Sequence, residues 1–241
     1  MDQLKFSLGP YELFSSILGG MPLLLAFCLL YNPVSSIQEL VPVVQKNSSI
    51  AIALSLLFIS YILGGTVQSL TWRYFKLLCT LLNEDYRYFG NLIHEKENWL
   101  LQQGAQVDKS SLDFDGRLVL RLQEKTGISQ ENKFIESRVA AYLREHNRQA
   151  SLSAAELHLA NHIMYRSWSF GFCLLSVVLL INLFRTPTHP FEQWILPLLS
   201  LGFAYLTFFR ALHFKRWNNR ELLLGFYFAA GNEKIQNLTQ L

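Results

Sequence analysis

Four long stretches without a charged residue constrain the fold of this chain more than any other feature. They run over residues 13–38, 47–72, 167–184 and 193–209, and they hold 26, 26, 18 and 17 residues. All four are rich in Leu, Ile, Val and Phe. A helix needs about 20 residues, within a range of about 17–25, to cross a hydrocarbon core of about 30 Å. We therefore expect four transmembrane helices, over about 13–33, 49–72, 167–184 and 193–210.

The rest of the chain has a different composition. Only 16% of the 241 residues are charged, whereas soluble domains average about 25%. Residues 73–166 alone hold 25 charges in 94 positions, 13 basic and 12 acidic. Four apolar helices would overfill a soluble globule of this length, which disfavours a soluble core. The sequence predicts an all-α integral membrane protein with a cytosolic helical domain inserted between transmembrane helices 2 and 3.

The basic residues predict the orientation. Two short loops, over residues 32–48 and 185–192, separate the spans within each predicted hairpin. Of the 21 Lys and Arg residues, 19 lie outside these loops, which contain only Lys46 and Arg185. The positive-inside rule then places both termini in the cytoplasm, and in a bacterium the membrane would be the inner one. The predicted domains are a hairpin over 1–72, a cytosolic helical domain over 73–166, a second hairpin over 167–210, and a cytosolic C-terminal helix and tail over 211–241. Tryptophans favour membrane interfaces, and the candidate anchors are Trp72, Trp168, Trp194 and Trp217.

Helix signals continue beyond the apolar stretches. No breaker follows the second span, so it is expected to continue as one helix to about Gln103 and to stop at Gly104. Arg117 to Thr126 is read as a short helix rather than as a hairpin turning at Asp115 and Gly116.

Two further helices are predicted, each from a capping residue. Ser129 caps a helix that runs to about Asn147. Ser153 opens a capping box for a helix that leads into the third span. The C-terminal segment from Arg210 to Ala230, ended by Gly231, is either an extension of the fourth span or an interfacial helix.

Paired glycines occur in the first two spans, as Leu18-Gly19-Gly20 and Leu63-Gly64-Gly65. Such pairs permit close helix approach or a kink. The candidate packing or kink residues are Gly19, Gly20, Pro22, Gly64 and Gly65. An inverted-repeat transporter is disfavoured because the sequence similarity between the two spans covers only these three residues.

Catalytic and cofactor motifs are lacking, and no cofactor is expected. His158 and His162 share one face of a predicted helix, but two imidazoles alone do not complete a metal site; no metal site is predicted. Arg138, Arg144 and Arg148 suit an anionic ligand, although interspersed glutamates favour surface ion pairs. The low charge also argues against a nucleic-acid partner.

These features favour a non-enzymatic membrane protein. We expect its cytosolic domain to sense a small-molecule ligand or a cytosolic protein and to act on an oligomeric membrane assembly of identical chains in the lipid bilayer. The layout resembles that of small oligomeric channels and small membrane effectors of prokaryotic defence systems, although no motif carries the resemblance. The alternatives are a non-conducting membrane scaffold that recruits a cytosolic partner, and a membrane-interface enzyme with a site at His158 and His162.

Overall fold

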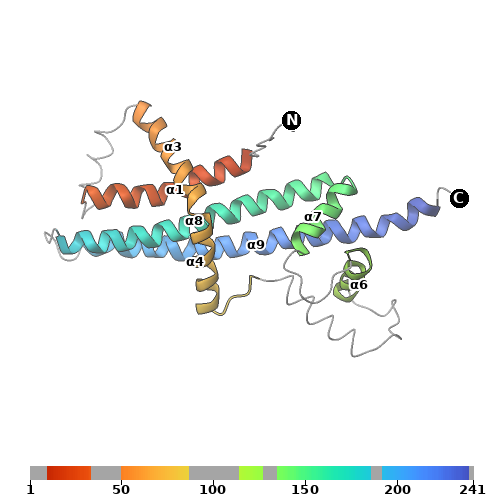
Figure 1. The fold of residues 1–241 in the computed structure, drawn as a ribbon. Coiled ribbons are helices and arrows are strands. Elements are labelled where there is room, and N and C mark those ends of the chain that lie inside the picture. Colours follow the sequence, from red (N-terminus) through yellow and green to blue (C-terminus); the bar gives the residue numbers. More distant parts are fainter. Residues whose placement is uncertain (1–9, 34–49, 87–113, 127–134, 186–191, 239–241) are drawn as a thin grey trace. The chain divides into compact units, whose positions relative to one another are not determined.

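The computed structural model describes residues 10–33, 50–86, 114–126, 135–185 and 192–238, which form seven helices (Figure 1). The helices are α1 (Pro10–Tyr31), α3 (Ile50–Thr66), α4 (Gln68–Leu81), α6 (Phe114–Thr126), α7 (Ile135–Glu145), α8 (Gln149–Arg185) and α9 (Glu192–Leu238). The chain divides into two compact units. The first unit comprises Met1–Glu84 and Leu159–Phe214, and the second comprises Asp85–His158 and Lys215–Leu241.

Three helices are long and apolar enough to cross a membrane, over Leu13–Tyr31, Gln149–Arg185 and Trp194–Gly231. A fourth span arises only if α3 and α4 are counted as one element, and their axes are bent by 58°. The predicted all-α class is confirmed for the described residues, together with three of the apolar stretches as candidate spans.

The second apolar stretch does not continue as the single straight helix that the sequence predicts. α3 ends at Thr66, and the chain turns at Val67 before α4 begins. The Thr66 hydroxyl donates to the Ile62 carbonyl of its own helix at 2.9 Å. Such back-bonding and the preceding Gly64-Gly65 pair both weaken a straight helix, so the bend has a local cause.

α4 also ends well before the predicted stop, which is a second correction. Asn83 takes a left-handed conformation with φ of 54°. The Glu84 N–H donates to the Cys79 carbonyl at 2.8 Å, and the Asn83 N–H donates to the Thr80 carbonyl at 3.3 Å. These two bonds form a Schellman motif, which ends a helix. Gln103 and Gly104 lie outside the described residues.

In the first unit, α1 packs against both α3 and α8 (Figure 1). The Ser60 hydroxyl of α3 donates to the Ile17 carbonyl of α1 at 2.6 Å. The Trp168 indole and the Asn182 amide of α8 donate to the carbonyls of Leu18 and Leu29. Because the residues of these two contacts follow the same order along both helices, α1 and α8 are parallel.

α8 and α9 pair in antiparallel fashion within the first unit. The Ser176 hydroxyl donates to the Pro197 carbonyl and the Ser169 hydroxyl to the Ala204 carbonyl, each at 2.9 Å. From one contact to the other, the residue number rises by seven on α8 and falls by seven on α9. Seven residues are the repeat of a left-handed coiled coil. The proline in the fourth apolar stretch lies near the start of α9 and does not interrupt it.

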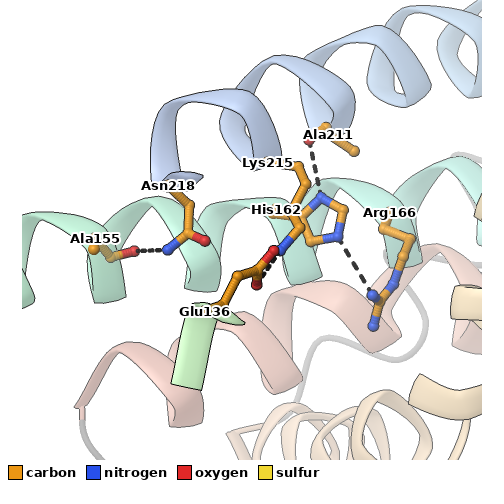
Figure 2. Close-up of polar contacts among 7 residues, drawn as sticks. All are labelled: Glu136, Ala155, His162, Arg166, Ala211, Lys215 and Asn218. Atoms are coloured by element: carbon orange, nitrogen blue, oxygen red, sulfur yellow. Dashed lines mark hydrogen bonds and ion pairs between the residues drawn. The ribbon is translucent and has the colours of Figure 1, made fainter. Parts of the chain in front are cut away.

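In the second unit, α6, α7, α8 and α9 contribute to one apolar core. Its buried members are Leu118, Leu122, Ile135, Val139, Leu143, Leu152, Ala155, Leu222, Leu223, Phe226 and Ala229. The Asn218 amide of α9 donates to the Ala155 carbonyl of α8 at 2.8 Å (Figure 2). Lys215, whose side chain is 9% exposed, pairs with Glu136 at 2.7 Å.

The helix boundaries in this unit settle several sequence predictions. Arg117–Thr126 is helical, as part of α6, and not a hairpin. α7 ends at Glu145 in a second Schellman motif around Asn147, whose φ is 54°. Ser153 is not a cap, because α8 already begins at Gln149. Gly231 does not end the last helix, because α9 continues from the fourth apolar stretch to Leu238. Ser129 lies outside the described residues.

Candidate functional site

A buried arginine–histidine pair lies in the first unit, where α8 meets α4 and α9. His162 and Arg166 are 1% and 7% exposed. The His162 Nδ1 lies 2.9 Å from the Ala211 carbonyl, and its Nε2 lies 3.4 Å from the Arg166 Nη1 (Figure 2). A carbonyl only accepts hydrogen bonds, so Nδ1 carries the proton and Nε2 is left to accept from the guanidinium. This pattern requires the neutral Nδ1–H tautomer of His162.

The remaining contacts of Arg166 are also with neutral groups. Its Nε donates to the Thr71 hydroxyl at 3.2 Å, and its Nη2 donates to the Gln68 carbonyl at 3.4 Å. The guanidinium carbon lies 5.2 Å from the centroid of the Trp72 ring. Within the part of the chain that the structure describes, no carboxylate is paired with Arg166. Burying an arginine without an opposite charge costs free energy that long hydrogen bonds to neutral groups offset only in part.

Aromatic rings enclose the histidine side of this pair. The Phe75 and Trp72 rings meet the imidazole edge to face, with centroids 5.0 and 6.0 Å away. Phe75 also contacts Phe208 of α9 at 5.4 Å. A second cation, the Lys76 ammonium, lies 5.1 Å from the centroid of the same Trp72 ring. Two cations therefore lie near one indole, beside a buried neutral histidine.

The two histidines singled out in the sequence belong to different units. His162 would have to give up a bond to Ala211 or to Arg166 in order to ligate a metal. His158 packs its ring against Trp217 of α9, with centroids 5.3 Å apart. No group of three His, Cys, Asp or Glu side chains that could hold a metal ion occurs among the described residues.

The three candidate ligand-binding arginines lie in the second unit. Arg138 and Arg144 are exposed, and Arg148 is half-buried. Arg144 lies 3.6 Å from the Glu156 carboxylate, with both side chains more than half exposed. Exposed pairs of this kind contribute little to stability. Arg144 already faces a carboxylate, so it gives no independent evidence for an anion site.

The paired glycines occupy different environments. A Cβ at Gly20 would overlap the backbone of Ser60, and a Cβ at Gly64 would overlap the backbone of Ser16. A Cβ at Gly19 would lie 3.1 Å from the Ser167 side chain, whereas Gly65 has nothing within 4 Å. α1 and α3 therefore touch through backbone at Gly20 and Gly64.

The sequence reading missed Gly171, which lies against Pro22. A Cβ at Gly171 would lie 2.8 Å from the Pro22 Cβ. The signal was present, because Gly171 is the only glycine in the apolar stretch 167–184. The reading also missed Arg166, although it lies four residues after His162, a spacing that puts both on one helix face.

The candidate tryptophan anchors differ in exposure. Trp194 and Trp217 are 44% and 38% exposed, and Trp72 is half-buried. Trp168 is half-buried and its indole N–H donates to the Leu18 carbonyl. Trp168 therefore joins two helices through the same N–H that an interfacial anchor would present to water.

Hydroxyl and amide groups in the apolar helices also join neighbouring helices. Ser60, Ser169, Ser176, Ser200 and Asn182 all donate to backbone carbonyls of a neighbouring helix. Such bonds contribute about 0.6 to 2 kcal/mol each in a membrane. These groups hold helices together.

No known protein family, curated protein or solved structure gives a significant match to the chain.

Proposed function

We propose that the chain is a four-span membrane protein whose second unit, in the cytosol, detects a ligand or partner and acts on an oligomeric membrane assembly built from the first unit. One observation carries the proposal. α8 and α9 are each unbroken helices, over Gln149–Arg185 and Glu192–Leu238, and each contributes residues to both units. A continuous helix is a rigid element through which a change in one unit can bias the other.

The helix directions support the proposed topology. α1 and α8 are parallel, while α8 and α9 are antiparallel. Parallel α1 and α8, each the first helix of its predicted hairpin, are consistent with both chain ends on one side. α3 has 17 residues, which is the lower limit for a span. α4 buries Thr71, Phe75 and Cys79 on one face and exposes Arg73 and Lys76, as expected for a helix lying along the interface.

A non-conducting scaffold is the second candidate, and a separate observation favours it. The hydroxyl groups of Ser60, Ser176 and Ser200 donate to carbonyls of neighbouring helices and are therefore not free to line a pore within one protomer. The conducting version requires an oligomer, whereas the scaffold does not. The oligomeric state and the conductance together distinguish the two.

The test is a mass measurement in detergent followed by flux from liposomes. We expect a defined oligomer that releases K⁺ or a small dye from loaded liposomes. A monomer without flux would overturn the channel proposal and would favour the scaffold. A stable partner that copurifies with a non-conducting protein would favour it further.

A matched pair of variants tests the role of helix continuity. Leu157 lies on α8 at the edge of the second unit and is 38% exposed. Leu157→Pro breaks the helix because it removes a backbone donor and clashes with the preceding turn, whereas Leu157→Ala keeps the helix. We expect the proline variant to change the flux at least threefold relative to the alanine variant. Equal flux in the two variants would show that α8 does not couple the units.

A further inference from the structure

The Arg166 guanidinium is a buried charge without a visible opposite charge. It has five N–H donors, and its three hydrogen bonds, at 3.2 to 3.4 Å, all lead to neutral acceptors. One N–H on each terminal nitrogen has no acceptor among the described residues. Buried charges in proteins are usually paired or bound to an ion. Among the described residues, none supplies the negative charge that would balance Arg166.

A second cation makes the same place suitable for an anion. Lys76 is exposed, and its ammonium lies 5.1 Å from the centroid of the Trp72 ring whose other neighbour is Arg166, at 5.2 Å. His162 accepts from the Arg166 guanidinium through Nε2, which only the neutral imidazole can do, and therefore adds no charge. An anion that binds both groups has to enter from the side of Lys76, because Lys76 is exposed whereas Arg166 is 7% exposed.

The position along α8 indicates which anions are available. Arg166 is the last charged residue before the uncharged stretch 167–184. In the proposed four-span topology, on which this inference rests, that position lies at the cytoplasmic edge of the hydrocarbon. The phosphates of lipid headgroups lie at this depth, and basic groups between transmembrane helices bind anionic headgroups there.

We propose that Arg166 and Lys76 bind a phosphate group beside Trp72. The planar guanidinium presents paired N–H donors that match two phosphate oxygens, and the lysine adds a point charge. The phosphate belongs either to an anionic lipid of the inner leaflet or to a soluble phosphate compound. Both sources share one recognition chemistry, and the bound phosphate supplies the negative charge that no described residue gives Arg166.

The experiment measures binding and needs no flux. The full chain is purified in a neutral detergent, and native mass spectrometry counts bound phosphatidylglycerol and phosphatidylcholine. In parallel, the melting temperature is followed with each lipid and with inorganic phosphate alone. We expect retention of phosphatidylglycerol over phosphatidylcholine if the source is a lipid. Stabilisation by inorganic phosphate alone, to the same extent, would identify a soluble source for the same site.

Three variants with the same loss of one positive charge make the test specific. Arg166→Gln is expected to weaken binding at least about tenfold, since it removes charge-assisted hydrogen bonds. Lys76→Gln, at an exposed position that tolerates change, is expected to weaken it about threefold. Arg73→Gln is the control, because Arg73 is exposed on the same helix, and it should change binding less than twofold.

Equal binding of both lipids, with no effect of phosphate, would overturn the proposal. So would losses in Lys76→Gln no larger than those in Arg73→Gln, because general attraction to anions would then explain the data. Because the readouts are the number of bound lipids and the melting temperature, not conductance, a non-conducting protein that retains the phosphate would refute only the channel proposal.

Discussion

Replacing Gly64 by alanine is expected to force α1 and α3 apart. The new Cβ would overlap the backbone carbonyl of Ser16, and backbone cannot rotate away as a side chain can. Gly65 is the control next to it, because a Cβ there meets nothing within 4 Å. The two substitutions change the same residue type in the same helix and differ only in what the added methyl group meets.

The two substitutions are expected to change the free energy of unfolding in opposite directions. Overpacking of this kind costs about 1 to 3 kcal/mol, and separation of the helices also breaks the Ser60–Ile17 hydrogen bond, worth about 0.6 kcal/mol in a membrane. Alanine is preferred over glycine in a helix by about 0.5 to 1 kcal/mol. Gly64→Ala should therefore lower the free energy of unfolding by about 1 to 3 kcal/mol, and Gly65→Ala should raise it by about 0.5 to 1 kcal/mol.

The assay is thermal unfolding in detergent, followed by intrinsic tryptophan fluorescence. A change of 1 kcal/mol shifts the Tm by about 2 to 4 °C in a protein of this size. Gly64→Ala should lower the Tm by about 2 to 12 °C, and Gly65→Ala should raise it by about 1 to 4 °C. Equal shifts of the same sign would refute the backbone contact between α1 and α3.

Three further predictions concern the second unit. Asn147 has a φ of 54°, so Asn147→Val should cost about 1 to 2 kcal/mol while Asn147→Gly keeps the Tm of the wild type; equal Tm values for the two would contradict the left-handed helix end. Glu136→Ala should lower the free energy of unfolding in urea by about 1 to 3 kcal/mol, because it removes the carboxylate that pairs with the buried Lys215 ammonium. The loss is smaller than for a fully buried pair because the glutamate is partly exposed. Lys215→Met, which removes the charge and keeps the packing, should lower the free energy of unfolding less than Glu136→Ala does. Equal losses in the two variants would argue against the ion pair. Burial, followed by the Glu145 carboxylate, raises the pKa of the Tyr142 phenol above its ordinary value of 10.0. The stability that neutral Tyr142 contributes is present below pH 10.0 and is lost as the pH rises through the raised pKa. A difference absorbance titration against Tyr142→Phe should show the late ionisation, and Glu145→Gln should bring it earlier; an unchanged midpoint would exclude the carboxylate as a cause.

Much of the helical content follows from the sequence for a simple reason. A membrane helix satisfies its own backbone and must present apolar side chains over a fixed length, so the length of an uncharged stretch is informative without any knowledge of the fold. α1, α8 and α9 coincide with three such stretches. α6 was also predictable, because its helix period and following glycine are local signals.

The errors in the sequence reading have local causes that composition does not reveal. The bend after Thr66 depends on one hydroxyl bond beside two glycines. The end of α4 depends on Asn83, which adopts a left-handed conformation that glycine more often takes at a helix end. Gly and Pro are the residues that usually mark the end of a helix, and Asn83 is neither.

The sequence by itself determined that apolar helices dominate the chain and where its charges lie, because both are properties of the chain read one residue at a time. Only the tertiary structure decided which helices touch. It placed Arg166 against Thr71, 95 positions away, and brought the backbones of Gly64 and Ser16 together. The physical reason is that a phosphate site or a close helix contact depends on groups from distant segments, whose meeting follows from packing and not from local preference.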